Sequence, residues 1–188
     1  AAGTAGSGNS PNHQLQLRSY LDLSSRLELA TMLYFTDALP AQQVPGSGFP
    51  YVVHVMKVAT EVLHADDGTF DVDLAMQCAL LHDCVEDARV APESLRVAFG
   101  DRVAEGVLAL TKDEALPKAE RMAGSLRRIR AQPREVWLVK LADRITNLEP
   151  APPAWTAEKR GAYLAEAKAI LEALGEAHAG LAARLRGK

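Results

Sequence analysis

Apolar residues recur at helical spacing through most of this chain. Over residues 51–64 the apolar side of a predicted helix is formed by Val52, Val55, Val58, Ala59 and Val62. The same period runs through residues 15–39, 118–130, 134–148 and 154–186, with Pro or Gly residues between most of the segments. No alternation of strand and helix patterns interrupts them. The pattern therefore predicts an all-α protein built as one helical bundle.

The same pattern divides the chain into a leader and one domain. Residues 1–12, rich in Gly, Ala and Ser, are expected to be a flexible leader or a cloning remnant, and residues 13–188 to form the domain. Asp71 or Asp73 is expected to cap the helix that follows it. Gly175 and Gly180 are candidate breaks in the last helical segment.

Composition excludes some partners. Lys and Arg number 21 against 24 Asp and Glu, giving a formal net charge of −3, so the whole molecule does not attract nucleic acid or an anionic membrane. The basic run within residues 118–130 is either a solvated face or a phosphate-facing surface, and its lack of interleaved aromatic residues argues against a nucleic-acid partner. With Cys78 and Cys84 expected as buried thiols, and with no apolar span or signal pattern, a cytoplasmic location is predicted.

Polar chemistry is concentrated in residues 80–87, directly after an apolar run. His82, Asp83, Glu86 and Asp87 lie within six positions. If the run continues as one helix, His82 stacks on Glu86 and Asp83 on Asp87 at a spacing of four. Like charges at that spacing repel, and a divalent cation bound by the His-Asp pair would offset the repulsion. The alternative is a solvated acidic end of a helix.

Two further side chains extend this candidate site. His54 lies near the start of its predicted helix, and Asp143 lies in a strongly apolar segment, where an unpaired carboxylate is costly. Asp143 therefore needs a partner, either a metal or a neighbouring cation, Lys140 or Arg144.

Together the candidates form a set from three predicted helices. Its members are His54, His82, Asp83 and Asp143. Two imidazoles and two carboxylates suit Mn, Fe or Zn better than Ca. Glu86 and Asp87 follow one turn later, where they can orient or deprotonate a water. This chemistry predicts metal-assisted hydrolysis, most naturally of a phosphate ester or anhydride.

These residues resemble the HD phosphohydrolase superfamily, which is all-α and is named for a doublet seen here as His82-Asp83. More narrowly, an ordered series of blocks over about residues 28–175 resembles the hydrolase domain of RelA/SpoT proteins, of the stand-alone small alarmone hydrolase type. The blocks are residues 50–54, 79–87, 99–104, 110–112 and 139–148.

The resemblance implies both a reaction and roles for residues. It implies that a metal, usually manganese, is held by His54, His82, Asp83 and Asp143, that Glu86 and Asp87 are catalytic, and that the 3′-pyrophosphate of (p)ppGpp is removed. The positions implied to meet the nucleotide are Lys118, Asn147, Lys159 and Tyr163. A net acidic protein can hold such a polyphosphate if Lys118, Lys140, Arg144 and Lys159 gather around the metal.

One departure bears on the base. The family's loop before the first His usually carries an Arg-Lys pair, and here those positions are Pro45-Gly46. Loss of a cation-π contact makes an adenine alarmone, (p)ppApp, a rival substrate. Two other functions stay open: a nucleotidase or phosphatase acting on another cofactor such as NADPH, and a non-catalytic alarmone sensor. The last helix either closes the core or serves a homodimer.

Overall fold

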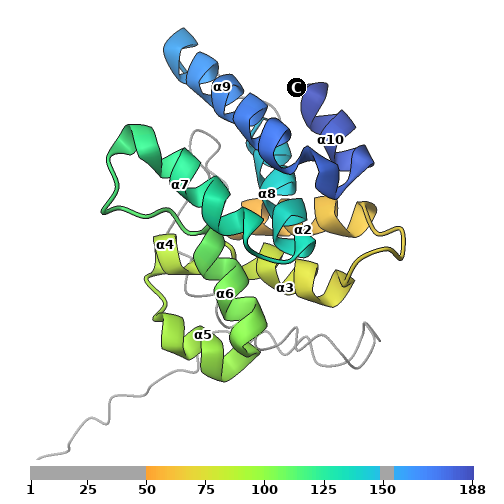
Figure 1. Cartoon of the computed structure of the whole chain (residues 1–188), viewed down its shortest axis with the longest axis vertical. Helices are drawn as coiled ribbons and strands as arrows, with labels where there is room; N and C mark the ends of the chain where they lie inside the picture. The colour runs from red at the N-terminus through yellow and green to blue at the C-terminus, as the bar shows by residue number, and fades with distance from the viewer. Residues whose placement is uncertain (1–49, 149–154) are drawn as a thin grey trace, which may run out of the picture.

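The computed structural model describes residues 50–148 and 155–188, and every regular element in these ranges is helical (Figure 1). The predictions for residues 1–49, including the leader and Pro45-Gly46, lie outside the described residues. In chain order the elements are α2 (Val52–His64), α3 (Val72–Leu81), α4 (Cys84–Ala88), α5 (Pro92–Phe99), α6 (Asp101–Leu110), α7 (Lys118–Arg130), α8 (Arg134–Asn147), α9 (Ala157–Leu174), η1 (Gly175–Ala177) and α10 (Ala179–Arg186). The all-α prediction is confirmed.

Helix α8 is the centre of the bundle. It contacts α2, α3, α6, α7, α9 and α10, and Figure 1 places it between α2, α7 and α9. Leu138, Leu141 and Ile145 on this helix are fully buried, as expected from the apolar run seen in the sequence. Because α8 is covered on several sides, its polar side chains are drawn into the interior of the molecule.

Caps and prolines set the helix boundaries. The side chain of Asp71 accepts a hydrogen bond from the Leu74 amide at 3.1 Å, which settles the choice between Asp71 and Asp73 as the cap of α3. Gly100, at a φ of 80°, ends α5 in a conformation that favours glycine. The predicted break at Gly175 is present as η1, whereas Gly180 lies inside α10, which begins after His178.

The expectation of one continuous helix through residues 75–87 is wrong. Helix α3 ends at Leu81 and α4 begins at Cys84, so that His82 and Asp83 form a turn between them. Asp83 has a φ of −107° and a ψ of 0°, outside the helical range. Consecutive side chains of a helix point about 100° apart. The turn instead lets two adjacent side chains face the same site.

The basic residues of α7 are not simply a solvated face. Arg121 donates to the main-chain oxygens of Leu116 and Glu114, each at 3.0 Å. Arg128 donates to the carbonyl oxygen of Thr111 at 2.6 Å. These two arginines hold the connection between α6 and α7 in place by satisfying carbonyl groups that no helix satisfies. No helix in the described ranges is long and apolar enough to cross a membrane.

Candidate metal centre

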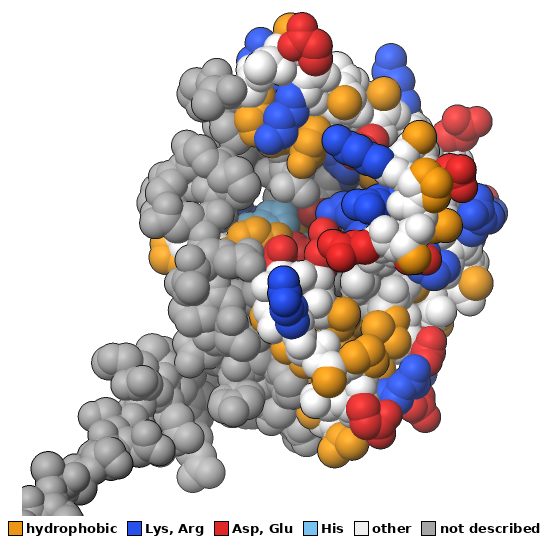
Figure 2. Space-filling model, turned by 90° about the vertical axis from the view of Figure 1, so that its left-hand side faces the viewer, with side chains coloured by type: hydrophobic (Ala, Val, Ile, Leu, Met, Phe, Trp, Pro, Cys, Tyr) orange, Lys and Arg blue, Asp and Glu red, His pale blue; other side chains and the backbone are white. Residues whose placement is uncertain are grey.

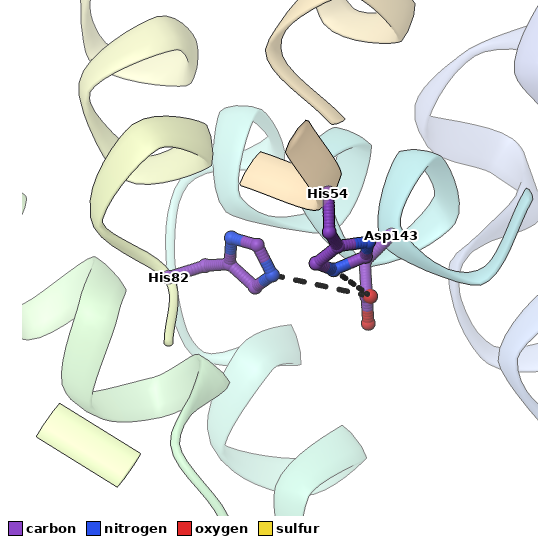
Figure 3. A group of neighbouring side chains, drawn as sticks. All are labelled: His54, His82 and Asp143. Carbon is purple, nitrogen blue, oxygen red and sulfur yellow. Dashed lines mark ion pairs between the residues drawn. The ribbon is translucent and has the colours of Figure 1, made fainter. Parts of the chain in front are cut away.

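Three candidate ligand atoms from two helices and one turn converge beneath the surface. His54 of α2, His82 after α3 and Asp143 of α8 offer atoms that all lie within 4.8 Å of one another (Figure 3). Asp143 Oδ1 is 3.4 Å from His54 Nε2 and 3.9 Å from His82 Nε2. All three side chains are buried. Two imidazoles and a carboxylate at these separations form a candidate site for a divalent metal.

The orientation of the His82 ring is fixed by a hydrogen bond to the main chain. Its Nδ1 lies 2.8 Å from the carbonyl oxygen of Ala79, which can only accept, so Nδ1 carries the proton and donates. Nε2 is then the atom that faces His54 and Asp143. It is buried, and Asp83 Oδ2 lies 2.9 Å away from it. In a typical metal-ligating histidine, one ring nitrogen donates to a main-chain carbonyl and the other faces the metal. His82 has this arrangement.

Asp143 divides its two oxygens between separate tasks. Oδ1 faces the two histidines and accepts from Asn147 Nδ2 at 2.5 Å, while Oδ2 accepts from Lys140 Nζ at 3.0 Å. Burial alone would raise the pKa of Asp143, but Lys140 and the two histidines hold it well below its usual range. The ion pair with Lys140 and the orientation toward a metal are therefore compatible.

Asp83 lies at the side of this triad. Its Oδ2 is 3.8 Å from His54 Nε2 and accepts a hydrogen bond from the Tyr51 hydroxyl. Although burial opposes it, the charge of His82 lowers the pKa of Asp83 to about 2. Tyr51 was not among the residues predicted for the site. Its position three residues before His54, at the start of the same helix, could have indicated that the two side chains lie close together.

The acidic pair Glu86 and Asp87 occupies the first turn of α4. Glu86 is bound twice by one residue, since Lys112 Nζ donates to Oε1 at 2.6 Å and the Lys112 amide to Oε2 at 3.3 Å. The pKa of Asp87 is raised, first by burial and then by the charge of Asp83. Figure 2 shows a hollow on this side of the molecule, with histidine at its floor and acidic and basic side chains beside it.

The expected nucleotide-binding residues other than Lys118 fall into two groups. Asn147 and Lys140 contact Asp143, which brings them to the metal ligands. Lys118 is exposed at the first position of α7. Its exposure leaves it accessible to a ligand.

The second group is an aromatic and basic cluster formed where α8 meets the start of α9. Arg144 lies over the ring of Tyr163, with its guanidinium carbon 4.7 Å from the centroid, and donates to Glu166 at 2.7 Å. The rings of Tyr163 and Trp155 are 4.3 Å apart, and Lys159 Nζ lies 4.6 Å from the centroid of the Trp155 ring. We call these five residues the α9 cluster. Trp155 was not among the sequence-predicted site residues.

The fold and the site agree with the comparisons to known proteins. The model of the HD domain matches residues 32–185. Since this match covers most of the chain, the protein belongs to the HD-domain family.

Several curated relatives carry one name. Guanosine-3′,5′-bis(diphosphate) 3′-pyrophosphohydrolase MESH1 of Danio rerio is 35% identical over 143 residues, covering 74% of this chain and 78% of the relative. The human protein of the same name is 32% identical over 131 residues, covering 68% and 72%. A solved structure of a metazoan ortholog of SpoT, described as hydrolyzing ppGpp, superposes with a TM-score of 0.73 at 30% identity, covering 87% of this chain and 93% of the other.

Proposed function

We propose that this protein hydrolyses the 3′-pyrophosphate of an alarmone nucleotide, (p)ppGpp or (p)ppApp, releasing pyrophosphate and the nucleoside 5′-di- or triphosphate. The observation that carries the proposal is the buried convergence of His54, His82 and Asp143, with an acidic pair next to it. The chain belongs to a family branch whose relatives are named for this reaction.

His54, His82, Asp83 and Asp143 would hold a divalent metal. The Nε2 of His82 and the Oδ1 of Asp143 face one another and fit such an ion, and the mixed nitrogen and oxygen donor set suits Mn²⁺, with Fe or Zn as alternatives. When bound, the metal supplies Lewis-acid polarisation of a phosphoryl oxygen and of a water.

Glu86 and Asp87 would handle the proton of the attacking water. The raised pKa of Asp87 brings its carboxylate closer to the range in which a general base works near neutral pH. Lys112 holds Glu86 through both carboxylate oxygens and so fixes its direction. Asp87 then accepts the proton, while Glu86 orients the water.

The nucleotide would be held by residues around this centre. Lys118 would meet phosphate and Asn147 the ribose region, while Lys159 and Tyr163 would line the nucleotide pocket. Lys140 and Arg144 are already engaged by Asp143 and Glu166, so their contribution to a polyphosphate is the positive charge they keep nearby.

The decisive experiment is product analysis with the Mn²⁺-loaded protein. ppGpp and ppApp are offered side by side, with Asp83→Ala as the blank and NADPH as a further candidate substrate. We expect pyrophosphate from one or both alarmones and none from the blank. Orthophosphate release from NADPH without alarmone turnover would favour the phosphatase alternative. Alarmone binding that leaves the nucleotide intact would favour the sensor.

A further inference from the structure

Lys112 makes two contacts to Glu86 and yet keeps half of its side chain exposed to solvent. Its side chain is 52% exposed, whereas that of Lys140, the other lysine bound to a site carboxylate, is 10% exposed. Lys140 is a buried structural partner of Asp143. Lys112 has the access to solvent that a ligand-binding residue needs.

The position of Lys112 is set by the main chain. Thr111 ends α6, where its amide and its hydroxyl both donate to the Val107 carbonyl oxygen at 3.0 Å. Arg128 of α7 then holds the Thr111 carbonyl oxygen at 2.6 Å. The next amide, that of Lys112, is thereby directed at Glu86 Oε2. Two helices therefore fix the backbone at residue 112 while its side chain stays half in solvent.

Lys112 also lies within electrostatic reach of the metal ligands. Partial burial lowers the pKa of its ammonium group, but Glu86, and beyond it Asp83 and Asp143, raise it. A cation at this place faces any phosphate that approaches the centre.

We propose that Lys112 is a substrate-binding residue that exchanges partners: its ammonium group rests on Glu86 in the substrate-free protein and moves to a phosphate of the bound nucleotide. This inference rests on the proposed function. The exchange releases Oε1 of Glu86, while the Lys112 amide keeps Oε2 in place. Substrate binding thereby frees one oxygen of Glu86 to contact the attacking water, and without a phosphate that oxygen stays covered.

The exchange is energetically accessible. A half-exposed ion pair contributes little net free energy, because water solvates both ions when the pair separates. A phosphate carries more negative charge than a carboxylate and offers several acceptor oxygens, so it competes well for an ammonium group. The carboxylate that Lys112 leaves behind remains hydrogen-bonded to a backbone amide.

The test measures binding without turnover. Mn²⁺-loaded Glu86→Gln is titrated with ppGpp by calorimetry, and the double variant Glu86→Gln, Lys112→Ala is compared with it. We expect about tenfold or greater weakening in the double variant and a flatter dependence of affinity on salt, because one charge-assisted contact to phosphate is lost. Lys168→Ala in the same background is the control, since Lys168 is an exposed lysine on α9. It should bind as Glu86→Gln does.

The outcomes separate this inference from the proposed function. Equal ppGpp affinity of Glu86→Gln and the double variant would overturn the proposal that Lys112 binds a phosphate. Its role would then be limited to holding Glu86 in position. Failure of every variant, and of the wild-type protein, to bind ppGpp would overturn both. Mn²⁺ affinity is measured in parallel and should be the same in all variants, which excludes damage to the metal centre as the cause of any weakening.

Discussion

At the scale of single residues, Asp143 has two roles: it is the counter-charge of a buried lysine, and it is a candidate metal ligand. Its Oδ2 neutralises Lys140 in the interior, and its Oδ1 is turned to the two histidines. A change at this position therefore has two effects that can be measured separately.

Asp143→Asn is expected to abolish tight metal binding and to destabilise the metal-free protein. The buried ammonium group of Lys140 loses its counter-charge, which costs about 1–3 kcal/mol in the free energy of unfolding. Urea denaturation in the presence of a chelator measures the stability, and elemental analysis measures the metal. His54→Gln is the matched variant, because it removes a ligand and leaves Lys140 paired. Equal stability of the two metal-free variants would contradict the double role of Asp143.

Metal affinity should rise with pH. Burial lowers the pKa of His82, but the charges of Asp83 and Asp143 outweigh burial and raise it to about 9. In the metal-free protein His82 is therefore protonated at neutral pH, and its Nε2 must lose the proton to bind an ion. The apparent affinity for Mn²⁺ should increase from pH 6 to about 9 and then level off. Calorimetry in two buffers of different ionisation enthalpy detects the released proton, and an affinity independent of pH would refute this assignment.

The same shift has a consequence for the metal-free fold. Because the pKa of His82 is higher in the folded than in the unfolded chain, its charge contributes stability that is fully present below the unfolded value near 6.5. That contribution is lost as the pH rises through about 9.

At the scale of elements, the approach of α6 to its neighbours depends on one glycine. A Cβ atom at Gly106 would lie 2.8 Å from Cys78 Sγ on α3 and 3.0 Å from Val136 Cγ2 on α8. Both distances are shorter than a van der Waals contact, and both neighbours are buried. This close contact positions α6, and Thr111 and Lys112 follow directly after the end of that helix.

Gly106→Ala is expected to destabilise the protein by about 1–3 kcal/mol, because overpacking outweighs the gain of about 1 kcal/mol in helix propensity. Gly161→Ala in α9 is the control, since nothing lies within 4 Å of an added Cβ there. It should be neutral or stabilising by up to about 1 kcal/mol. Chemical denaturation of both variants checks the pair, and a stabilised Gly106→Ala would contradict the close approach of α6.

Arg128 should influence catalysis from outside the centre. Arg128→Met removes the donor to the Thr111 carbonyl oxygen, which loosens the connection that carries Lys112. We expect lower kcat with unchanged Mn²⁺ affinity, and faster amide exchange over residues 111–117. Arg127→Met, at an exposed neighbouring position, is the control and should leave all three measurements unchanged. Equal effects of the two substitutions would show that Arg128 acts only through its charge.

The helices and the ligands could be predicted from sequence for different reasons. The period of apolar residues reflects burial directly, so α7 was expected at the bounds it has and α8 ends within one residue of its expected end. His82 and Asp83 were noticed because such polar side chains are rare after an apolar run. These residue types therefore identified the candidate site even though the helix does not continue through them. The turn itself could not be predicted, because it depends on tertiary contacts that no local pattern encodes.

Some contacts around the candidate centre could not be predicted from the sequence. Lys112 lies in one of the blocks that resemble the family, but lysine is ordinary in a polar connector, and only the fold brings it to Glu86 across 26 positions of sequence. Trp155 likewise became a candidate only because the fold places its ring against Tyr163 and Lys159, which lie one turn apart on α9. Pairs of this kind are set by the packing of helices, which a single sequence does not reveal.

At the scale of the whole molecule, the metal would join three helices of the core. An ion bound to α2, α8 and the turn after α3 favours the folded state by mass action, by about 2.7 kcal/mol when its free concentration is one hundred times its dissociation constant. Removal of the metal with a chelator should therefore lower the melting temperature of the wild-type protein and leave that of Asp83→Ala nearly unchanged. Calorimetric scans of both proteins with and without EDTA make the comparison. An unchanged wild-type melting temperature would contradict tight binding at this site.

Two neighbouring residues of α8 contact different parts of the molecule, and this has an evolutionary consequence. Asp143 and Arg144 are adjacent, yet the first serves the buried centre and the second reaches Tyr163 and Glu166 on another helix. Substitutions on α9 therefore alter the surroundings of Arg144 and leave the ligands untouched. Under the proposed function, the buried centre and the surroundings of the nucleotide can therefore change independently, so that a lineage could alter the molecule it binds while keeping the residues proposed for the reaction.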